Sequence, residues 1–344
     1  MSILVTGSIA NDHLMAFPGR FREQFVDGKL DEISLSFLVD ELEIRRGGVA
    51  ANIAFGMGRL GLSPVLVGAV GSDFAEYRQW LERHGVDCSG VRISTTAHTA
   101  RFQCTTDADQ NQIASFYAGA MTEAREIELA PIVDALPGGA SSLQMVLISP
   151  NDPEAMIRHS EECRAKGYPF ASDVSQQVAR MDGPQIRSLV EGATFLFTNA
   201  YERSVLEQKT GWSKEDVLAR VGTSLTTQGE KGVIIERAGE EPIAVPAGVA
   251  RSIAEPTGVG DAFRAGFLTG TSWNLGLERS AQFGAVLATL VIETVGTQEY
   301  DLDPTDFSTR LKEAYGEEAA AEIESVWLPV LEARDAATTT AEEK

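Results

Sequence analysis

The chain has 344 residues, 43% of them hydrophobic, which suits one large α/β domain or two smaller ones. Its formal net charge of −21 repels nucleic-acid phosphates, so polymer binding is a poor interpretation. No apolar run reaches the roughly 18 residues of a membrane helix, and the N-terminus lacks the basic segment of a signal peptide. The three cysteines are scattered without metal-ligand spacing, which predicts a cytoplasmic protein.

The first third of the chain mixes strand and helix patterns. In chain order, we expect a strand at 2–8, a strand at 31–45, helices at 48–61 and 73–84 with a strand at 65–68 between them, and short strands at 99–105 and 112–117. The strand at 31–45 follows from an alternation of apolar and polar residues. A polar turn at 107–111 joins the last two strands.

From residue 129 onward, helix and strand patterns alternate. We expect helices at 129–136 and 153–166 and from about 201; strands at 144–149, 169–173, 194–198, 222–227 and 232–237; and terminal helices at 260–275, 277–294 and 304–332. This alternation predicts an α/β fold, a doubly wound, mainly parallel sheet with helices on both faces. We expect residues 1–333 to form one domain, segments 14–46 and 93–118 to form a small β-sheet lid over the site, and the polar tail 334–344 to be disordered.

The most informative segment is 255–267, where two glycines precede an apolar helical pattern. The N-terminus of a helix exposes unpaired N–H groups and the positive end of the helix dipole, so it binds anions. Gly258 and Gly260 let a phosphate approach the backbone. Asp261 follows at once and is placed to accept a proton from a hydroxyl group. An anion site beside a carboxylate base predicts phosphoryl transfer to an alcohol, although Asp is also common in the first turn of a helix.

A second glycine motif opens the helix predicted at 48–61. Gly47 and Gly48 permit close approach of a ligand, and Asn52 offers a donor and an acceptor suited to sugar hydroxyls. A plain loop-to-helix junction is the alternative. Gly56-Met57-Gly58-Arg59-Leu60-Gly61 matches G-x-G-x-x-G but lies inside this helix, so we expect helix packing and a helix end at Gly61, not a dinucleotide site.

The two glycine motifs resemble the two signatures of the ribokinase family of sugar and nucleoside kinases. The first consists of Gly47-Gly48 with Asn52, and the second is 257–261. Asn199-Ala200-Tyr201-Glu202 is similar to the N-x-x-E element of that family. Within it, segments 5–15, 96–102 and 173–177 most resemble bacterial adenosine kinases. The resemblance implies ATP-dependent phosphorylation of adenosine at the 5′-hydroxyl in purine salvage, with Mg²⁺, and a homodimer formed through the lid.

The resemblance also implies roles for individual residues. The transfer site consists of Asp261 as base and the amides of Gly258, Val259 and Gly260. Nucleoside binding is expected from Ser8, Asp12, Gly48, Asn52, Phe102, Phe116, Gln176 and Gln177. ATP binding is expected from Asn199, Thr227, Gln228, Gly229, Glu230, Lys231, Gly232 and Gly260, and Mg²⁺ binding from Glu202.

Several of these roles have a structural alternative. The two phenylalanines could be the core of a hairpin, the two glutamines helix surface, and Glu202 a charge at a helix start. The family usually carries Asp where this chain has Glu255, and the longer side chain would weaken or move the monovalent-cation site that the resemblance implies, which leaves K⁺ activation in doubt.

Three other functions are compatible with parts of the pattern: a kinase for a sugar or another nucleoside, a nucleoside sensor without catalysis, and, least supported, an NAD oxidoreductase.

Overall fold

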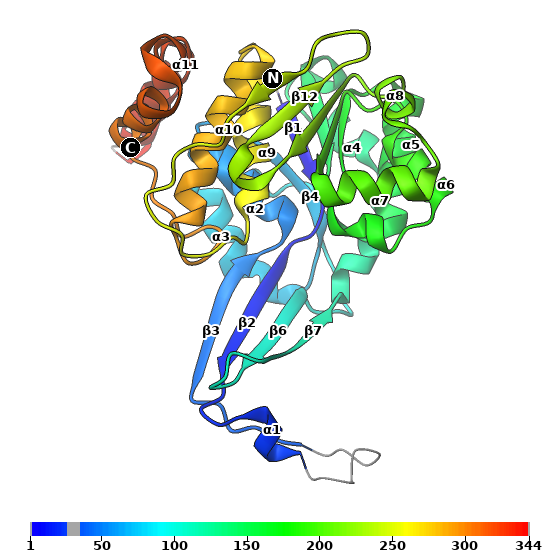
Figure 1. The fold of residues 1–344 in the computed structure, drawn as a ribbon, viewed down its shortest axis with the longest axis vertical. Coiled ribbons are helices and arrows are strands. Elements are labelled where there is room, and N and C mark those ends of the chain that lie inside the picture. Colours follow the sequence, from blue (N-terminus) through cyan, green and yellow to red (C-terminus); the bar gives the residue numbers. More distant parts are fainter. Residues whose placement is uncertain (1, 26–34, 343–344) are drawn as a thin grey trace.

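The computed structural model describes residues 2–25 and 35–342, which form an α/β body and a smaller β-sheet that projects from it (Figure 1). The sheet of the body has the strand order β13-β12-β11-β10-β9-β8-β1-β4-β5 and is parallel except for β12 and β13. Its strands are β1 (Ser2–Thr6), β4 (Val65–Val70), β5 (Val91–Ile93), β8 (Leu143–Ile148), β9 (Phe170–Asp173), β10 (Phe195–Asn199), β11 (Thr223–Thr227), β12 (Val233–Glu236) and β13 (Ile243–Val245).

Alternating side chains of the central strands enter two separate hydrophobic cores. Leu4 of β1 packs into one core, whereas its neighbours Ile3 and Val5 pack into the other. The helices that supply the first core are α4 (Leu129–Asp134), α5 (Pro153–Lys166), α6 (Gly183–Val190), α7 (Ala200–Thr210) and α8 (Lys214–Leu218). Those of the second are α2 (Val49–Arg59), α3 (Ala75–Arg83), α9 (Val259–Ser272), α10 (Leu277–Ile292) and α11 (Pro304–Glu342). The predicted doubly wound architecture is therefore confirmed.

The second sheet, here called the lid, has the strand order β3-β2-β6-β7. Its strands are β2 (Ala10–Ala16), β3 (Glu41–Gly47), β6 (Ala100–Thr106) and β7 (Gln112–Tyr117). The strand predicted at 31–45 is wrong for 35–40, and 31–34 lie outside the described residues. Phe37 instead packs against the rings of Phe17 and Phe21 near the short helix α1 (Phe21–Gln24), so its apolar character serves a cluster at the tip of the lid.

The C-terminal helix also differs from the sequence prediction. Element α11 consists of two helical parts that meet at Gly316, whose φ of +86° and ψ of 168° are not helical. The second part continues to Glu342, through most of the segment 334–344 that we expected to be disordered, while 343–344 are not described. Arg334 donates to the carbonyl groups of Gly58 and Arg59 at the end of α2, which ties α11 to the body at this point. In the described part of the chain, no helix has the length and apolarity to cross a bilayer.

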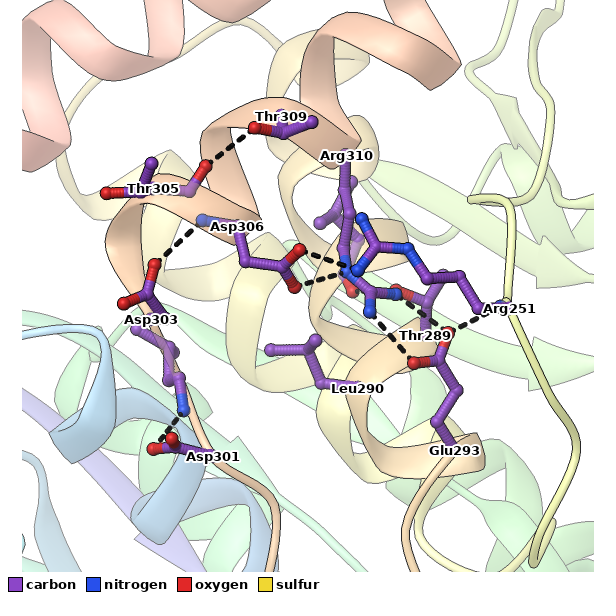
Figure 2. A network of polar contacts seen from close by, with 12 residues as sticks. Arg251, Thr289, Leu290, Glu293, Asp301, Asp303, Thr305, Asp306, Thr309 and Arg310 are labelled. Atoms are coloured by element: carbon purple, nitrogen blue, oxygen red, sulfur yellow. Dashed lines mark hydrogen bonds and ion pairs between the residues drawn. The ribbon is translucent and has the colours of Figure 1, made fainter.

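The segment that leads to the predicted anion motif is attached to α10 and α11 by an ion-pair network (Figure 2). Arg310 of α11 donates from both Nη atoms to Glu293 and from Nε to Asp306. Arg251 donates from its backbone to Glu293 and from Nη1 to Asp306. Because bidentate arginine–carboxylate pairs are geometrically specific, this network fixes the chain four residues before Glu255.

Glycines allow the helices around the anion motif to pack at short range. Gly56 of α2 lies so close to α9 that an added Cβ would come within 2.8 Å of the Ala265 Cβ. Gly61 has a φ of +106° just beyond α2, as expected for a helix end. The G-x-G-x-x-G pattern is thus a packing and termination element, as predicted.

Helices α9 and α10 pack even more closely, and this contact yields a first prediction. A Cβ on Gly266 would lie 2.5 Å from the Gly284 Cα, with no flexible atom to yield. We therefore expect Gly266→Ala to lower the free energy of unfolding by about 2–3 kcal/mol, although Ala normally stabilises a helix interior by about 1 kcal/mol. Urea denaturation measures the change.

Gly276→Ala is the matched control, because Gly276 has a φ of −59° and nothing lies within 4 Å of an added Cβ. It should change the free energy of unfolding by less than about 1 kcal/mol. Equal effects of the two substitutions would contradict the close-packing explanation.

Candidate active site

A cavity of about 580 Å³ lies between the carboxyl ends of the central strands and the lid. In open α/β sheets, ligands bind at this edge. All eight residues predicted for nucleoside binding line the cavity: Ser8, Asp12, Gly48, Asn52, Phe102, Phe116, Gln176 and Gln177. Gly258 and Asp261 line it as well, so segments from both ends of the chain share one site.

The lid contributes one row of side chains across its four strands. Arg45, Asp12, Phe102 and Phe116 are register partners on β3, β2, β6 and β7, and all four line the cavity. Residues paired in this way project from the same face of a sheet. Phe116 remains 48% exposed, so the two rings form a wall of the cavity and not a hairpin core.

Asp12 is held in a poorly solvated position. Burial raises the pKa of its carboxyl to about 6, with a smaller contribution from Glu255 in the same direction, and Arg45 opposes both. A Cβ on Gly47 would lie 2.9 Å from the Asp12 Oδ2, so a larger residue there would displace the carboxylate. A partly desolvated carboxylate gains from hydrogen bonds, and sugar hydroxyls could donate them.

The two glycine motifs meet directly at Asp261. Asn52 Nδ2 donates to Asp261 Oδ2 over 2.9 Å, although 209 residues separate them. Asn52 Oδ1 accepts from Thr297 Oγ1 and Gln298 Nε2, which fixes the orientation of the amide. Thr297 and Gln298 were missed by sequence reasoning, because neither belongs to a motif. Burial raises the pKa of Asp261 to about 6, while Arg264 and Asn52 counteract the shift.

The backbone at both glycine motifs has conformations that favour glycine. Gly258 precedes α9 with a φ of +80°, and Gly48 precedes α2 with a φ of +94°. Ser8 Oγ accepts from the amide of Val49 over 3.0 Å, so this hydroxyl completes the start of α2 while it lines the cavity. Both helix N-termini therefore open on the same space. Ser8 already accepts from the amides of Val49 and Ala50 at the start of α2, so the start of α9 is the end whose amides can face a ligand.

Glu255, the residue that departs from the family pattern, is neutralised within the protein. Its Oε2 accepts from Arg45 Nη1 and from the Gly296 amide, both over 3.0 Å. The cavity-lining lid strand β3 is thereby connected to the loop before α9. A guanidinium already pairs with this carboxylate, so the oxygen is a poor ligand for a monovalent cation.

The residues predicted for ATP lie at the ends of β10 and β11. Asn199 and Thr227 are register partners at the carboxyl ends of these strands. The turn 228–232 follows, and positive φ angles at Gly229 and Gly232 shape it. Glu230 and Lys231 are exposed on this turn. None of these side chains lines the 580 Å³ cavity.

Glu202 forms a capping box with Asn199 at the start of α7. Its Oε2 accepts from the Asn199 amide over 2.8 Å, and its own amide donates to Asn199 Oδ1. The structural alternative for Glu202 is therefore present, while its other carboxylate oxygen remains available. Among the described residues, no three His, Cys, Asp or Glu side chains gather into a metal-binding group.

A buried ion pair that the sequence analysis did not assign lies beside these elements. Arg264 Nη2 on α9 donates to Asp173 Oδ1 at the end of β9 over 2.7 Å. Asp173 is fully buried, and burial raises its pKa to about 7 despite Arg264. Asp173 belongs to a segment that carried the family resemblance, but nothing in its local pattern indicated the pairing.

Comparison with known proteins agrees with this geometry. The model of the pfkB family of carbohydrate kinases matches residues 12–305, and the chain belongs to this family. Nucleoside kinases of two archaea are similar in sequence. The one from Methanothermobacter thermautotrophicus is 30% identical over 83% of this chain and 91% of its own. The one from Methanocaldococcus jannaschii is 29% identical over 78% and 86%.

A solved structure also shares the fold. The nucleoside kinase of Burkholderia thailandensis in complex with inosine has a TM-score of 0.77 and 31% identity, covering 92% of this chain and 99% of that one. The present protein is therefore a kinase of the ribokinase type, as the sequence motifs predicted.

Proposed function

We propose that the protein transfers the γ-phosphoryl group of ATP to the 5′-hydroxyl of adenosine. The observation that carries the proposal is that Asp12, Phe102 and Phe116 form one row across the cavity whose other wall bears Asp261. A carboxylate suits ribose hydroxyls, and aromatic faces suit a purine ring. The nucleoside kinases among its relatives support a nucleoside, and the adenosine kinase resemblance favours adenosine.

In the proposed reaction, Asp261 removes the proton of the 5′-hydroxyl as its oxygen attacks the γ-phosphorus in line. The bond from phosphorus to the β–γ bridging oxygen breaks, and ADP leaves. The amides of 258–260 at the start of α9 stabilise charge on the transferring group. Asn52 orients Asp261 and opposes its protonation through the 2.9 Å hydrogen bond.

Asn199, Thr227 and the turn 228–232 would hold the nucleotide. Magnesium would bind chiefly to the phosphates, with Glu202 contributing its free oxygen through water, and would neutralise charge on the transferring group. The donor set fits this arrangement because Mg²⁺ retains most of its hydration shell. Potassium is not part of the proposal, since Arg45 already pairs with Glu255.

Asp261→Asn tests the role of the base. We expect turnover to fall about 10²–10⁴-fold, the usual contribution of a positioned general base, while ATP still binds. In the wild type, kcat should fall as the pH decreases through about 6, because a carboxyl whose pKa is raised to about 6 is protonated below that value.

The control for that pH dependence is Asn52→Ala, which removes the hydrogen bond that lowers the pKa of Asp261. The acidic limb of its kcat profile should move to higher pH. Near-normal turnover of Asp261→Asn would exclude Asp261 as the base.

Substrate identity is tested by ADP release with adenosine, inosine, cytidine and ribose. We expect the nucleosides to be used far better than ribose. Phe102→Ala should lower kcat/KM for adenosine about tenfold or more and have little effect on kcat/KM for ribose, because a simple sugar has no aromatic ring to stack on Phe102. Gln103→Ala is the control, because Gln103 follows Phe102 on β6 and is exposed on the opposite face of the lid. Preference for ribose would favour the sugar-kinase alternative, and no ATP turnover would favour a sensor.

We also propose a homodimer formed through the outer face of the lid. Leu42, Ile44, Ile113 and Tyr117 are between 45% and 59% exposed on this face, opposite the cavity. Leu42 and Ile44 lie on β3 and Ile113 and Tyr117 on β7, at the two edges of the sheet with β2 and β6 between them. Exposed apolar side chains on one face favour an interaction surface. Leu42→Glu should yield a monomer in sedimentation velocity, whereas Ile93→Glu, at an equally apolar exposed position on β5, should not. A wild-type monomer would contradict the proposal.

A further inference from the structure

Arg264 occupies an unusual position for a cation. It lies four residues after Gly260 on α9, and long helical side chains extend toward the N-terminus of their helix. Its guanidinium accordingly covers the first turn: a Cβ on Gly260 would come within 2.7 Å of Arg264 Nη1. The N-terminus of a helix carries the positive end of the helix dipole, so a buried cation there is unfavourable unless anions accompany it.

Three carboxylates surround this guanidinium. Asp173 pairs with Nη2, and Asp261 and Glu202 are near enough to act on Arg264 electrostatically. Asp173 of β9 lies on the nucleoside side of the proposed active site, Asp261 of α9 at the transfer site, and Glu202 of α7 on the nucleotide side. Arg264 therefore lies where the two substrates are expected to meet.

The hydrogen-bonding capacity of Arg264 is not used up within the described protein. Its side chain is 10% exposed, and the only hydrogen bond it makes there runs from Nη2 to Asp173. Nε has no partner, and neither has Asp173 Oδ2. A guanidinium has five N–H donors, and a purely structural ion pair would be expected to satisfy more of them. Nη1, beside Gly260, is the donor nearest to the anion-binding turn.

We propose that Arg264 is a phosphate-binding residue, whose Nη1 reaches past Gly260 to the phosphoryl group at the start of α9, with Asp173 as the positioning residue that holds the guanidinium there. The inference rests on the proposed kinase function but not on the identity of the nucleoside. A side chain at residue 260 would displace Nη1 from this position. Of the arginines that line the cavity, Arg45 pairs with Glu255 and Arg46 with Glu299, whereas Arg180 lies beside Gln176 and Gln177 on the nucleoside side.

The test measures ligand binding to the full-length protein by calorimetry, separately for a non-hydrolysable β,γ-imido analogue of ATP, which keeps the γ-phosphoryl group, and for adenosine. Arg264→Gln should weaken binding of the ATP analogue about tenfold to a hundredfold, the range for loss of a hydrogen bond to a charged group, and leave adenosine binding unchanged. Arg264→Lys, which keeps the charge but loses the planar fork, should weaken binding of the analogue severalfold and lower kcat.

Arg187→Gln is the control for the same substitution elsewhere, because Arg187 is exposed and donates to the Thr210 carbonyl, and neither residue lines the cavity. It should leave both affinities unchanged. Equal loss of binding of the ATP analogue and of adenosine in Arg264→Gln, or wild-type affinity of that variant for the analogue, would overturn the proposal. If Arg264→Gln does not fold, wild-type affinity for the analogue together with wild-type kcat in Arg264→Lys overturns it. Failure of the wild type to bind the analogue would instead refute the kinase function itself.

Discussion

The hydrogen bond between Asn52 and Asp261 is the contact on which the site depends, because it joins two motifs from opposite ends of the chain. It requires α2 and α9 to approach closely, and Gly56 makes that possible by removing a side chain from the interface. Thr297 and Gln298 then fix the Asn52 amide from the side of α10. The helix packing thus determines both the position and the protonation of the proposed base.

Electrostatics impose a second constraint on this acidic chain. With a net charge of −21, the protein opposes the approach of a nucleotide, so positive potential at the site must be local. The start of α9 supplies amides, and Arg264 supplies a guanidinium within the first turn. Asp12, Asp173 and Asp261 are all carboxylates whose pKa burial raises toward neutrality.

Much of the fold and part of the site were predictable from the sequence, and the difference between the parts is physical. The βα alternation, the α5 bounds and the helix end at Gly61 follow from periodicity and local backbone preference, which are properties of short segments. The cavity-lining residues could be named because the two glycine motifs and the family resemblance identify them. Their contacts could not, since those depend on how distant segments pack.

The sequence predictions that differ from the structure also concern contacts between distant segments. The apolar residues near 35–40 alternate as in a strand, yet Phe37 turns inward to Phe17 and Phe21, a choice that only tertiary contact determines. The tail beyond 333 has the composition of a disordered segment, but Arg334 bonds to the end of α2. The Arg264–Asp173 pair was missed because a lone arginine within a helix has no local signal. Its partner lies 91 residues away.

The link between the lid and the body explains how substrate binding and phosphoryl transfer can share one geometry. Arg45 belongs to the same row of the lid as Asp12 and Phe102, and it also bonds to Glu255 at the start of the anion-binding loop. Arg251 and its ion-pair network fix the other end of that loop to α10 and α11. Glu255 therefore lies between two anchors, Arg45 on the lid and Arg251 on the body, and directly before the glycine turn of α9. The position of the lid row and the position of this turn are thus set by one chain of contacts.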